Sequence, residues 1–446
     1  MEERLRVVFL AAAVRLVIAP FFMHPGDLTT IYESSIMAVG GQNIYEYVYA
    51  RTLHMQSVTG LPVFFEGYAY HPLLIYFFAP FYWIFTLIAG TSPVVIDGHY
   101  PHLPILIYPW VALLIFLLKI PIIVADIIVV YLLAGIDLGK AKIYAFCPYV
   151  IFISAVWGMF DALVAVFLLA SYLAQTRSSL LSGVFYGLSL MKLYTIVLLP
   201  LYLARLLGQW KAFVKFLVGF SVTVSPAVYF FAISPESIWN VLVTFQGTRV
   251  MGGVNLYNFI WIVPDLPFDL AVSMLPNVLL IIALVLLIPT FGRRAPFLES
   301  ILAVMFVYFL FGKVINEQFL VSIFPLVLLC RKCDHRLWVA PLAFIFLRPP
   351  PSPFYNFALP ILWASPVFYS YYLEVDVVWR QLQAAGYLQI LMYAVGVAFS
   401  LVILWNLLRV LETTDRPKLG RSFSEPAQES AEGDSSFSRA LRILLR

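Results

Sequence analysis

A small set of polar residues in this chain has side chains suited to catalysis, and they stand between long apolar runs. Asp27 and Glu33 follow the first apolar run, and Tyr70 and His71 come after them. The remaining candidates are Trp157, Asp161, Lys192, Arg249, Lys313, Asn316, Glu317 and Gln318. A carboxylate can take a proton from an attacking hydroxyl as a general base, and lysine or arginine can hold a departing phosphate. Together these residue types predict a site for an anionic, lipid-linked substrate.

The elements that position these residues are predicted to be membrane helices. Hydrophobic residues make up 62% of the 446 residues and charged residues only 12%, whereas soluble domains carry about 25% charged residues. The apolar residues fall in runs near the ~20 residues that a helix needs to cross a bilayer, and continuous runs such as 105–134 lack the alternation of a β-barrel strand. The composition predicts an all-α polytopic membrane protein.

Basic residues predict the topology. Arg4 and Arg6 place the N-terminus in the cytoplasm, so a first helix over 7–23 leads into an outer loop at 24–104. We expect about twelve spans within 1–409, with the basic loops on the inner side. This topology includes a second outer loop at about 233–258 and a last helix over 386–408. Residues 410–446 are expected to be a disordered cytoplasmic tail. We expect 70–90 to lie as an interfacial helix, and 336–372 to form one kinked span or two.

Several apolar arms between residues 140 and 215 are shorter than the ~20 residues of a full crossing. Helices that stop early, with polar residues at the break, are typical of a water-accessible cavity. The breaks at Trp157, Asp161 and Lys192 fall on the outer side of the predicted topology. The same side is predicted to carry Asp27 and the second outer loop with Arg249.

The acidic candidates also have structural interpretations. Asp27 is a favoured residue type for capping a helix that begins near Thr29, and this role competes with that of the base. Glu33 is a helical neighbour of Asp27 that supports it or is simply solvated. Asp161 stands at the start of a predicted helix, where an acid is also stabilising as a cap.

The cationic and aromatic candidates have alternatives of the same kind. Lys192 can snorkel towards the membrane surface instead of binding substrate, whereas Lys313 is the preferred phosphate ligand. Arg249 lies in a glycine-flanked loop that suits a mobile contact to the donor. Tyr70 and His71 can serve as anchors at the membrane interface, where aromatic residues are common.

Two further motifs carry charge or sulfur. Lys119 and Asp126 lie seven residues apart in one apolar run, on one helix face, and we expect them to form a structural ion pair. Cys330 and Cys333 form a CxxC in a basic turn. Without a second CxxC to complete a zinc site, an ordinary loop pair is favoured over redox or metal chemistry.

Several of these segments together resemble a known superfamily. Gly26-Asp27, the stretch 41–45 and Tyr70-His71-Pro72 are similar to the first-loop pattern of C-type (GT-C) glycosyltransferases, and 154–161 is similar to a Trp-Gly-x-x-Asp element common in that superfamily. The stretches 184–194, 311–319 and 372–374 most resemble the catalytic subunits of GPI mannosyltransferase I. Pro25 replaces the first acid of the Asp-x-Asp in that family, which argues against a GPI acceptor and a two-acid metal site. The Trp-Trp-Asp signature of oligosaccharyltransferases is absent from the sequence.

The resemblance implies a GT-C fold and an inverting transfer with Asp27 as the base. The implied donor is a polyprenyl-phosphate sugar, with dolichyl-phosphate mannose favoured, and the implied acceptor is a lipid-linked or glycan molecule on the extracytoplasmic side. Lys313, Arg249, Lys192, Gln318, Asn316, His71 and Tyr70 would bind the donor, with Glu33, Trp157 and Asp161 in support. No cofactor is expected, and the use of a divalent metal stays open.

Expected partners are membrane lipids and the two substrates, with a small membrane subunit left open and no nucleic acid. Compact loops favour a prokaryotic or archaeal plasma membrane over the endoplasmic reticulum. Two rival functions remain, a secondary transporter or lipid flippase and a non-catalytic subunit of a glycosylation complex. The lack of a repeat between the two halves, and the gathering of charge at one face, argue against the transporter.

Overall fold

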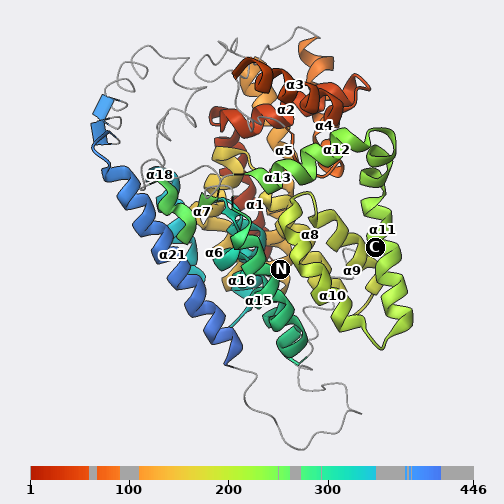
Figure 1. Cartoon of the computed structure of the whole chain (residues 1–446), viewed down its shortest axis with the longest axis vertical. Helices are drawn as coiled ribbons and strands as arrows, with labels where there is room; N and C mark the ends of the chain where they lie inside the picture. Colours follow the sequence, from red (N-terminus) through yellow and green to blue (C-terminus); the bar gives the residue numbers. More distant parts are fainter. Residues whose placement is uncertain are drawn as a thin grey trace, which may run out of the picture.

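The computed structural model describes residues 2–59, 68–90, 110–249, 251–261, 273–292, 294–347 and 384–412, with the pairs 377–378 and 381–382. The described chain is helical except for one pair of two-residue strands (Figure 1). The predicted tail beyond 412, most of 336–372 and the motif at 372–374 lie outside the described residues.

The helices of the N-terminal half follow the apolar runs of the sequence. They are α1 (Glu2–Ile18), α2 (Pro25–Val39), α3 (Ile44–Thr59), α4 (Leu73–Ala89), α5 (Trp110–Ile136), α6 (Leu138–Phe146), α7 (Pro148–Ile151), α8 (Asp161–Ala174), α9 (Ser179–Ser189), α10 (Leu199–Leu206) and α11 (Trp210–Ile233). Short 3-10 or π turns, η1 (Ala19–Phe21), η2 (Phe152–Trp157) and η3 (Leu193–Leu198), continue or connect them.

The C-terminal half begins with short elements and ends in long helices. They are α12 (Pro235–Trp239), η4 (Asn240–Thr244), α13 (Phe245–Thr248), η5 (Leu256–Trp261), α15 (Leu275–Leu287), η6 (Ile288–Gly292), α16 (Phe297–Phe311), α17 (Leu320–Leu329), η7 (His335–Trp338), α18 (Val339–Leu347) and α21 (Tyr387–Leu411). The strands β1 (Gly252–Gly253) and β2 (Val314–Ile315) pair in parallel.

Four described helices are long and apolar enough to cross a membrane, namely α5, α11, α15 with its π-helical extension to Gly292, and α21. Two bent pairs, α1 with α2 and α6 with α7, raise the number to six if each pair counts as one span. Other apolar helices, such as α8, α9 and α17, are only 10–17 residues long. At 1.5 Å per residue such helices fall short of a ~30 Å core. The described residues therefore support four to six spans, and about twelve remains a prediction.

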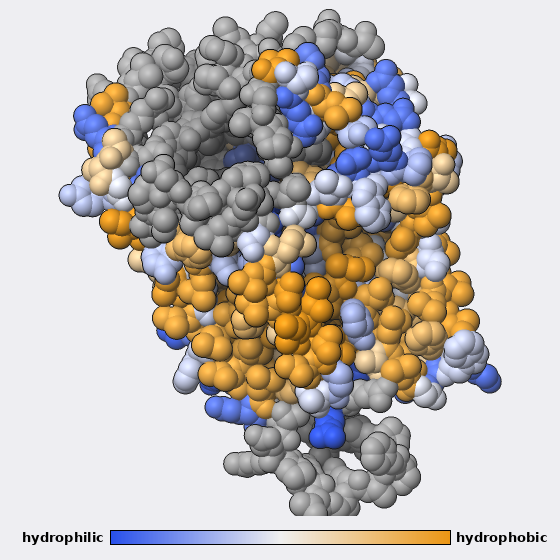
Figure 2. Space-filling view, viewed as in Figure 1, coloured by the Kyte–Doolittle hydropathy of each residue, from blue (hydrophilic) through white to orange (hydrophobic). Residues whose placement is uncertain are grey.

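The long helices differ in how they are packed. In α5 67% of the apolar window is buried, against 17% in α11, 28% in α15 and 33% in α21. The central helix is thus α5, while the other three present apolar side chains outward. Figure 2 shows these side chains as a broad hydrophobic zone, with hydrophilic residues gathered above and below it. An outer surface of this kind has no stable place in water, and it indicates a multi-pass membrane protein.

Helices of the two predicted outer loops gather at one end of the molecule. In Figure 1 α2, α3, α4, α12 and α13 lie together above the helical bundle, and we call this the loop end. Within the loop predicted at 24–104 the structure has the helices α2, α3 and α4. The helix predicted over 70–90 is present as α4, and its interfacial depth remains a prediction.

The predicted ion pair between Lys119 and Asp126 is wrong. The Asp126 carboxylate instead accepts hydrogen bonds from Arg15 Nε at 2.7 Å and from the Tyr144 hydroxyl at 2.8 Å. All three residues are buried. Lys119 donates to backbone carbonyls of other elements. Seven residues along a helix amount to about 10 Å, so the two side chains face the same way but reach different neighbours.

Candidate functional site

Asp27 is held in the first turn of α2, where the chain turns sharply after α1. The two helices meet at a bend of 86°. The helix cap is His24, whose Nδ1 accepts the backbone N–H of Asp27 at 3.2 Å. The prediction that Asp27 caps a helix beginning near Thr29 is therefore wrong, because α2 begins at Pro25, a residue type favoured at a first helical position.

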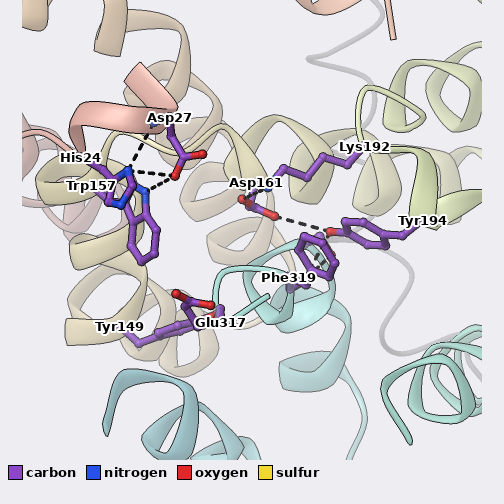
Figure 3. Close-up of polar contacts among 10 residues, drawn as sticks. His24, Asp27, Tyr149, Trp157, Asp161, Lys192, Tyr194, Glu317 and Phe319 are labelled. Atoms are coloured by element: carbon purple, nitrogen blue, oxygen red, sulfur yellow. Dashed lines mark hydrogen bonds and ion pairs between the residues drawn. The ribbon is translucent and has the colours of Figure 1, made fainter. Parts of the chain in front are cut away.

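The Asp27 carboxylate is fixed through one of its two oxygens. Trp157 Nε1 donates to Asp27 Oδ2 at 2.7 Å. The His24 ring stacks on Trp157 with centroids 4.8 Å apart. In Figure 3 the other oxygen points away from both rings. Since the Asp27 side chain keeps 23% of its surface exposed, this oxygen can meet a substrate.

The chain places Trp157 at a helix break. The π-helical turn η2 ends with Trp157, and Gly158 follows with φ +84°, a left-handed conformation that favours glycine. The Trp157 carbonyl accepts the His24 N–H at 2.9 Å. Trp157 therefore contacts Asp27 through its side chain and the helix cap His24 through its carbonyl, and its supporting role remains a prediction.

Lys192 and Asp161 form a buried ion pair. Their side chains meet at 2.6 Å, with 3% and 0% of their surfaces exposed, and the Lys192 ammonium lies 4.8 Å from the centre of the Phe160 ring. Lys192 therefore does not snorkel to a membrane surface. The structure assigns no cap to Asp161 either, because Phe160 holds the N-cap position of α8 and the carboxylate points to Lys192 (Figure 3).

The second outer loop is joined to the loop after α16 by the strands β1 and β2. The Gly252 N–H donates to the Lys313 carbonyl at 3.0 Å, and the Lys313 ammonium donates to the Gly247 carbonyl at 2.8 Å. Burial and the nearby charge of Arg249 lower the pKa of Lys313 below the usual lysine value. Two cations held this close together are typical of a site that receives an anion.

These side chains line one cavity of about 670 Å³. Its wall includes Asp27, Lys192, Arg249 and Lys313, so these four predicted residues lie around a single pocket. Four further predicted site residues line it as well, and they are Tyr70, Trp157, Asn316 and Gln318. Among the described residues of the wall, Asp27 carries the only carboxylate.

Four predicted residues lie outside the wall of this cavity, namely Glu33, Asp161, His71 and Glu317. Glu33 pairs with Arg51 at 3.1 Å, on another part of the loop end. Asp161 is fully buried and pairs with Lys192, which itself lines the wall. His71 is buried and accepts the Leu73 N–H through Nδ1 at 3.3 Å, so its neutral ring carries the proton on Nε2.

Burial lowers the pKa of His71 to about 4, so it is uncharged at neutral pH. With 3% of its surface exposed, it does not anchor the chain at a membrane interface. Tyr70 lines the cavity and packs edge-on against Phe160 at 4.8 Å. Burial raises the pKa of Tyr70, and the negative charge of Asp27 raises it further.

Several residues of the wall were not predicted from the sequence. His24, which holds Asp27, looked like the end of the first apolar run, although a histidine three residues before a helical acid could have suggested a cap. Tyr194 and Gln246 also line the cavity, as does Asn277, which projects from the span α15. An amide in an otherwise apolar span was the available signal for Asn277.

The cysteine motif lies outside the cavity wall. The three cysteines, Cys147, Cys330 and Cys333, are free thiols. No group of three or more histidine, cysteine or acidic side chains within the described part of the chain is arranged to hold a metal ion.

Neither a protein-family model nor a curated protein matches this chain.

Proposed function

We propose that this multi-pass membrane protein is a GT-C glycosyltransferase that moves a sugar, with mannose favoured, from a polyprenyl-phosphate donor to a lipid-linked or glycan acceptor. One observation carries the proposal. A single cavity combines a carboxylate, one oxygen of which lies outside the Trp157 hydrogen bond, with two cations, Arg249 and Lys313. This is the combination needed to activate a hydroxyl and to release a phosphate.

The proposed reaction is one displacement at the anomeric carbon. The acceptor hydroxyl donates its hydrogen bond to the outward oxygen of Asp27, which takes the proton as the new glycosidic bond forms. The bond from the anomeric carbon to phosphate breaks on the opposite face, so the anomeric configuration inverts. Lys313 and Arg249 stabilise the charge that grows on the leaving polyprenyl phosphate.

The place of the cavity supports this substrate class. Its wall combines α2 and α13 of the loop end with α15, a candidate membrane span. A donor with an apolar tail and a phosphate head has matching surroundings at such a boundary. The proposed topology keeps about twelve spans, puts the loop end outside the cytoplasm, and favours a prokaryotic or archaeal plasma membrane.

Lys192 has a different role in this proposal from that of a primary phosphate ligand. Asp161 balances its charge at 2.6 Å, so the pair contributes little net charge to the cavity. We assign the phosphate to Lys313 and Arg249, while Asn316 and Gln318, which lie on the same loop as Lys313, hydrogen-bond the sugar. Within the described part of the chain the buried Gln318 Oε1 has no hydrogen-bond partner, and it can accept a hydrogen bond from a sugar hydroxyl.

The test uses purified protein in lipid vesicles with radiolabelled polyprenyl-phosphate mannose and a lipid extract as acceptor. Label moved into a new glycolipid or glycan supports the proposal. Donor that crosses the bilayer unchanged would instead identify a flippase, and neither event would indicate a non-catalytic subunit. Glu33→Gln is a matched control for substitutions of Asp27, because Glu33 lies on the same helix and outside the cavity.

A further inference from the structure

Lys119 is a fully buried cation that the proposed reaction does not use. It lies in the middle of α5, with no exposed surface. Within the described residues its ammonium has no acidic side chain in ion-pair contact. An isolated ammonium loses several kcal/mol of solvation energy when it leaves water, so other groups must stabilise its charge.

Those groups are four backbone carbonyls at two helix ends. Lys119 Nζ donates to Ala19 O at 3.2 Å and to Phe22 O, at and just beyond the turn η1 that ends α1. It also contacts Ala155 O at 2.7 Å and Val156 O at 3.0 Å, in the last turn of η2, so its three N–H groups are shared among four carbonyls. Carbonyls at the C-terminal end of a helix lack helical partners and carry the negative end of the helix dipole, which suits a cation.

Both of these helix ends lead directly into the candidate site. Phe22 precedes His24 by two residues, and Val156 precedes Trp157. Beyond the lysine the two segments join through the His24 N–H to the Trp157 carbonyl, and then through Trp157 Nε1 to Asp27. Lys119 therefore fixes the separation of the two segments whose side chains meet at the proposed base.

The space around the lysine shows that its position is closely fitted. A Cβ at Gly158 would lie 2.7 Å from Lys119 Cε, and the backbone there is left-handed. Glycine at position 158 is therefore needed for two reasons. It allows the left-handed turn after Trp157, and it leaves room for the Lys119 side chain.

We propose that Lys119 is a positioning residue, which sets the hydrogen bond between Trp157 and Asp27 by joining the ends of η1 and η2. Its effect on transfer rests on the proposed function. Its effect on the local structure does not, because the carbonyl contacts exist whatever reaction the cavity performs.

Two substitutions separate the effect of the lysine's hydrogen bonds from the effect of its charge. Lys119→Met has nearly the same length without any hydrogen-bond donor, while Lys119→Gln keeps two N–H donors without the charge. The matched control is Asp126→Asn, which removes a buried charge from the same helix whose partners are Arg15 and Tyr144. All three are compared with the full-length protein in the same lipid nanodiscs.

The first readout is hydrogen–deuterium exchange of peptides that cover residues 22–28 and 152–158. Losing hydrogen bonds to a charged group should raise exchange in both peptides by about tenfold in Lys119→Met, and by less in Lys119→Gln. Asp126→Asn should leave both peptides unchanged and loosen the peptide around Arg15. The second readout is transfer, where kcat should fall while KM for the donor stays constant, because Arg249 and Lys313 lie on other elements.

Unchanged exchange in folded Lys119→Met would overturn the proposal, and so would equal loosening of both peptides in Asp126→Asn. If Lys119→Met does not fold, Lys119→Gln decides by the same criteria. If neither folds, the lysine serves the fold as a whole and the specific role is refuted. Wild-type protein without transfer activity would refute the proposed function and leave the exchange result standing.

Discussion

Breaking the ion pair of Asp161 and Lys192 should reveal how strongly the cavity wall depends on it. The two side chains meet at 2.6 Å and are almost fully buried, between the rings of Phe160 and Phe319. Solvent therefore screens neither charge. The informative set is Asp161→Asn, Lys192→Met and the double variant, which form a double-mutant cycle.

The magnitudes follow from the burial. Removal of one partner leaves an unbalanced charge in the protein interior, which costs about 3–5 kcal/mol. Removal of both leaves a neutral amide and an apolar chain of similar volume, with a cost of about 0–2 kcal/mol. The coupling energy between the two positions should therefore be about 4 kcal/mol or more.

The assay is reversible denaturant unfolding of the wild type and the three variants in one detergent, followed by circular dichroism. Donor affinity gives a second readout, because Asp161→Asn leaves an extra positive charge beside the cavity and should tighten the binding of the polyprenyl phosphate. Single substitutions that cost less than about 1 kcal/mol each and simply add in the double variant would refute the buried-pair account.

The remaining predictions concern the cavity wall and its surroundings. Lys313→Ala should raise KM for the donor at least tenfold, since a hydrogen bond to a charged group is worth about 1.5–3 kcal/mol, and unchanged steady-state kinetics would remove the phosphate role. Protonated Lys313 binds the phosphodiester, which stays a monoanion, so donor affinity measured by titration should be full at neutral pH. The donor affinity should then fall as the pH rises through the Lys313 pKa, which lies below the ~10.4 of an ordinary lysine. A donor affinity that stays constant up to about pH 10.5 would contradict this. Trp157→Phe keeps a ring to stack on His24 but loses the 2.7 Å bond to Asp27, and should lower kcat about tenfold at constant donor KM; a loss of donor binding alone would contradict the account. Glu33→Gln should leave transfer within about twofold of the wild type, because the half-buried pair with Arg51 is worth at most about 1 kcal/mol, and a large loss of activity would mean that the cavity extends to Glu33.

The sequence predicted the order of the helices well, because apolar runs in lipid allow little besides helices. It also predicted that Asp27, Arg249 and Lys313 lie on the same side of the membrane, because the basic loops were assigned to the opposite side. The three residues line one cavity. The extent of each crossing was not predictable in this way. An apolar run such as 297–311 is compatible with a span or with a buried short helix, and hydropathy does not distinguish them.

Partners of individual charges were the least predictable feature. Lys119 and Asp126 share a helix face, yet the lysine binds carbonyls and the aspartate binds Arg15. Which neighbour a buried charge reaches depends on the packing of helices far apart in sequence, and the contact between Arg15 and Asp126 spans 111 residues. The same holds for His24, whose stacking on Trp157 joins two segments that no local pattern connects.

Single-turnover transfer from pre-bound donor tests most directly whether Asp27 is the base. We predict that Asp27→Asn binds polyprenyl-phosphate mannose as tightly as the wild type, since the phosphate ligands are untouched, while the transfer step slows by about 10²–10⁴-fold. Transfer at the wild-type rate from Asp27→Asn would contradict the account.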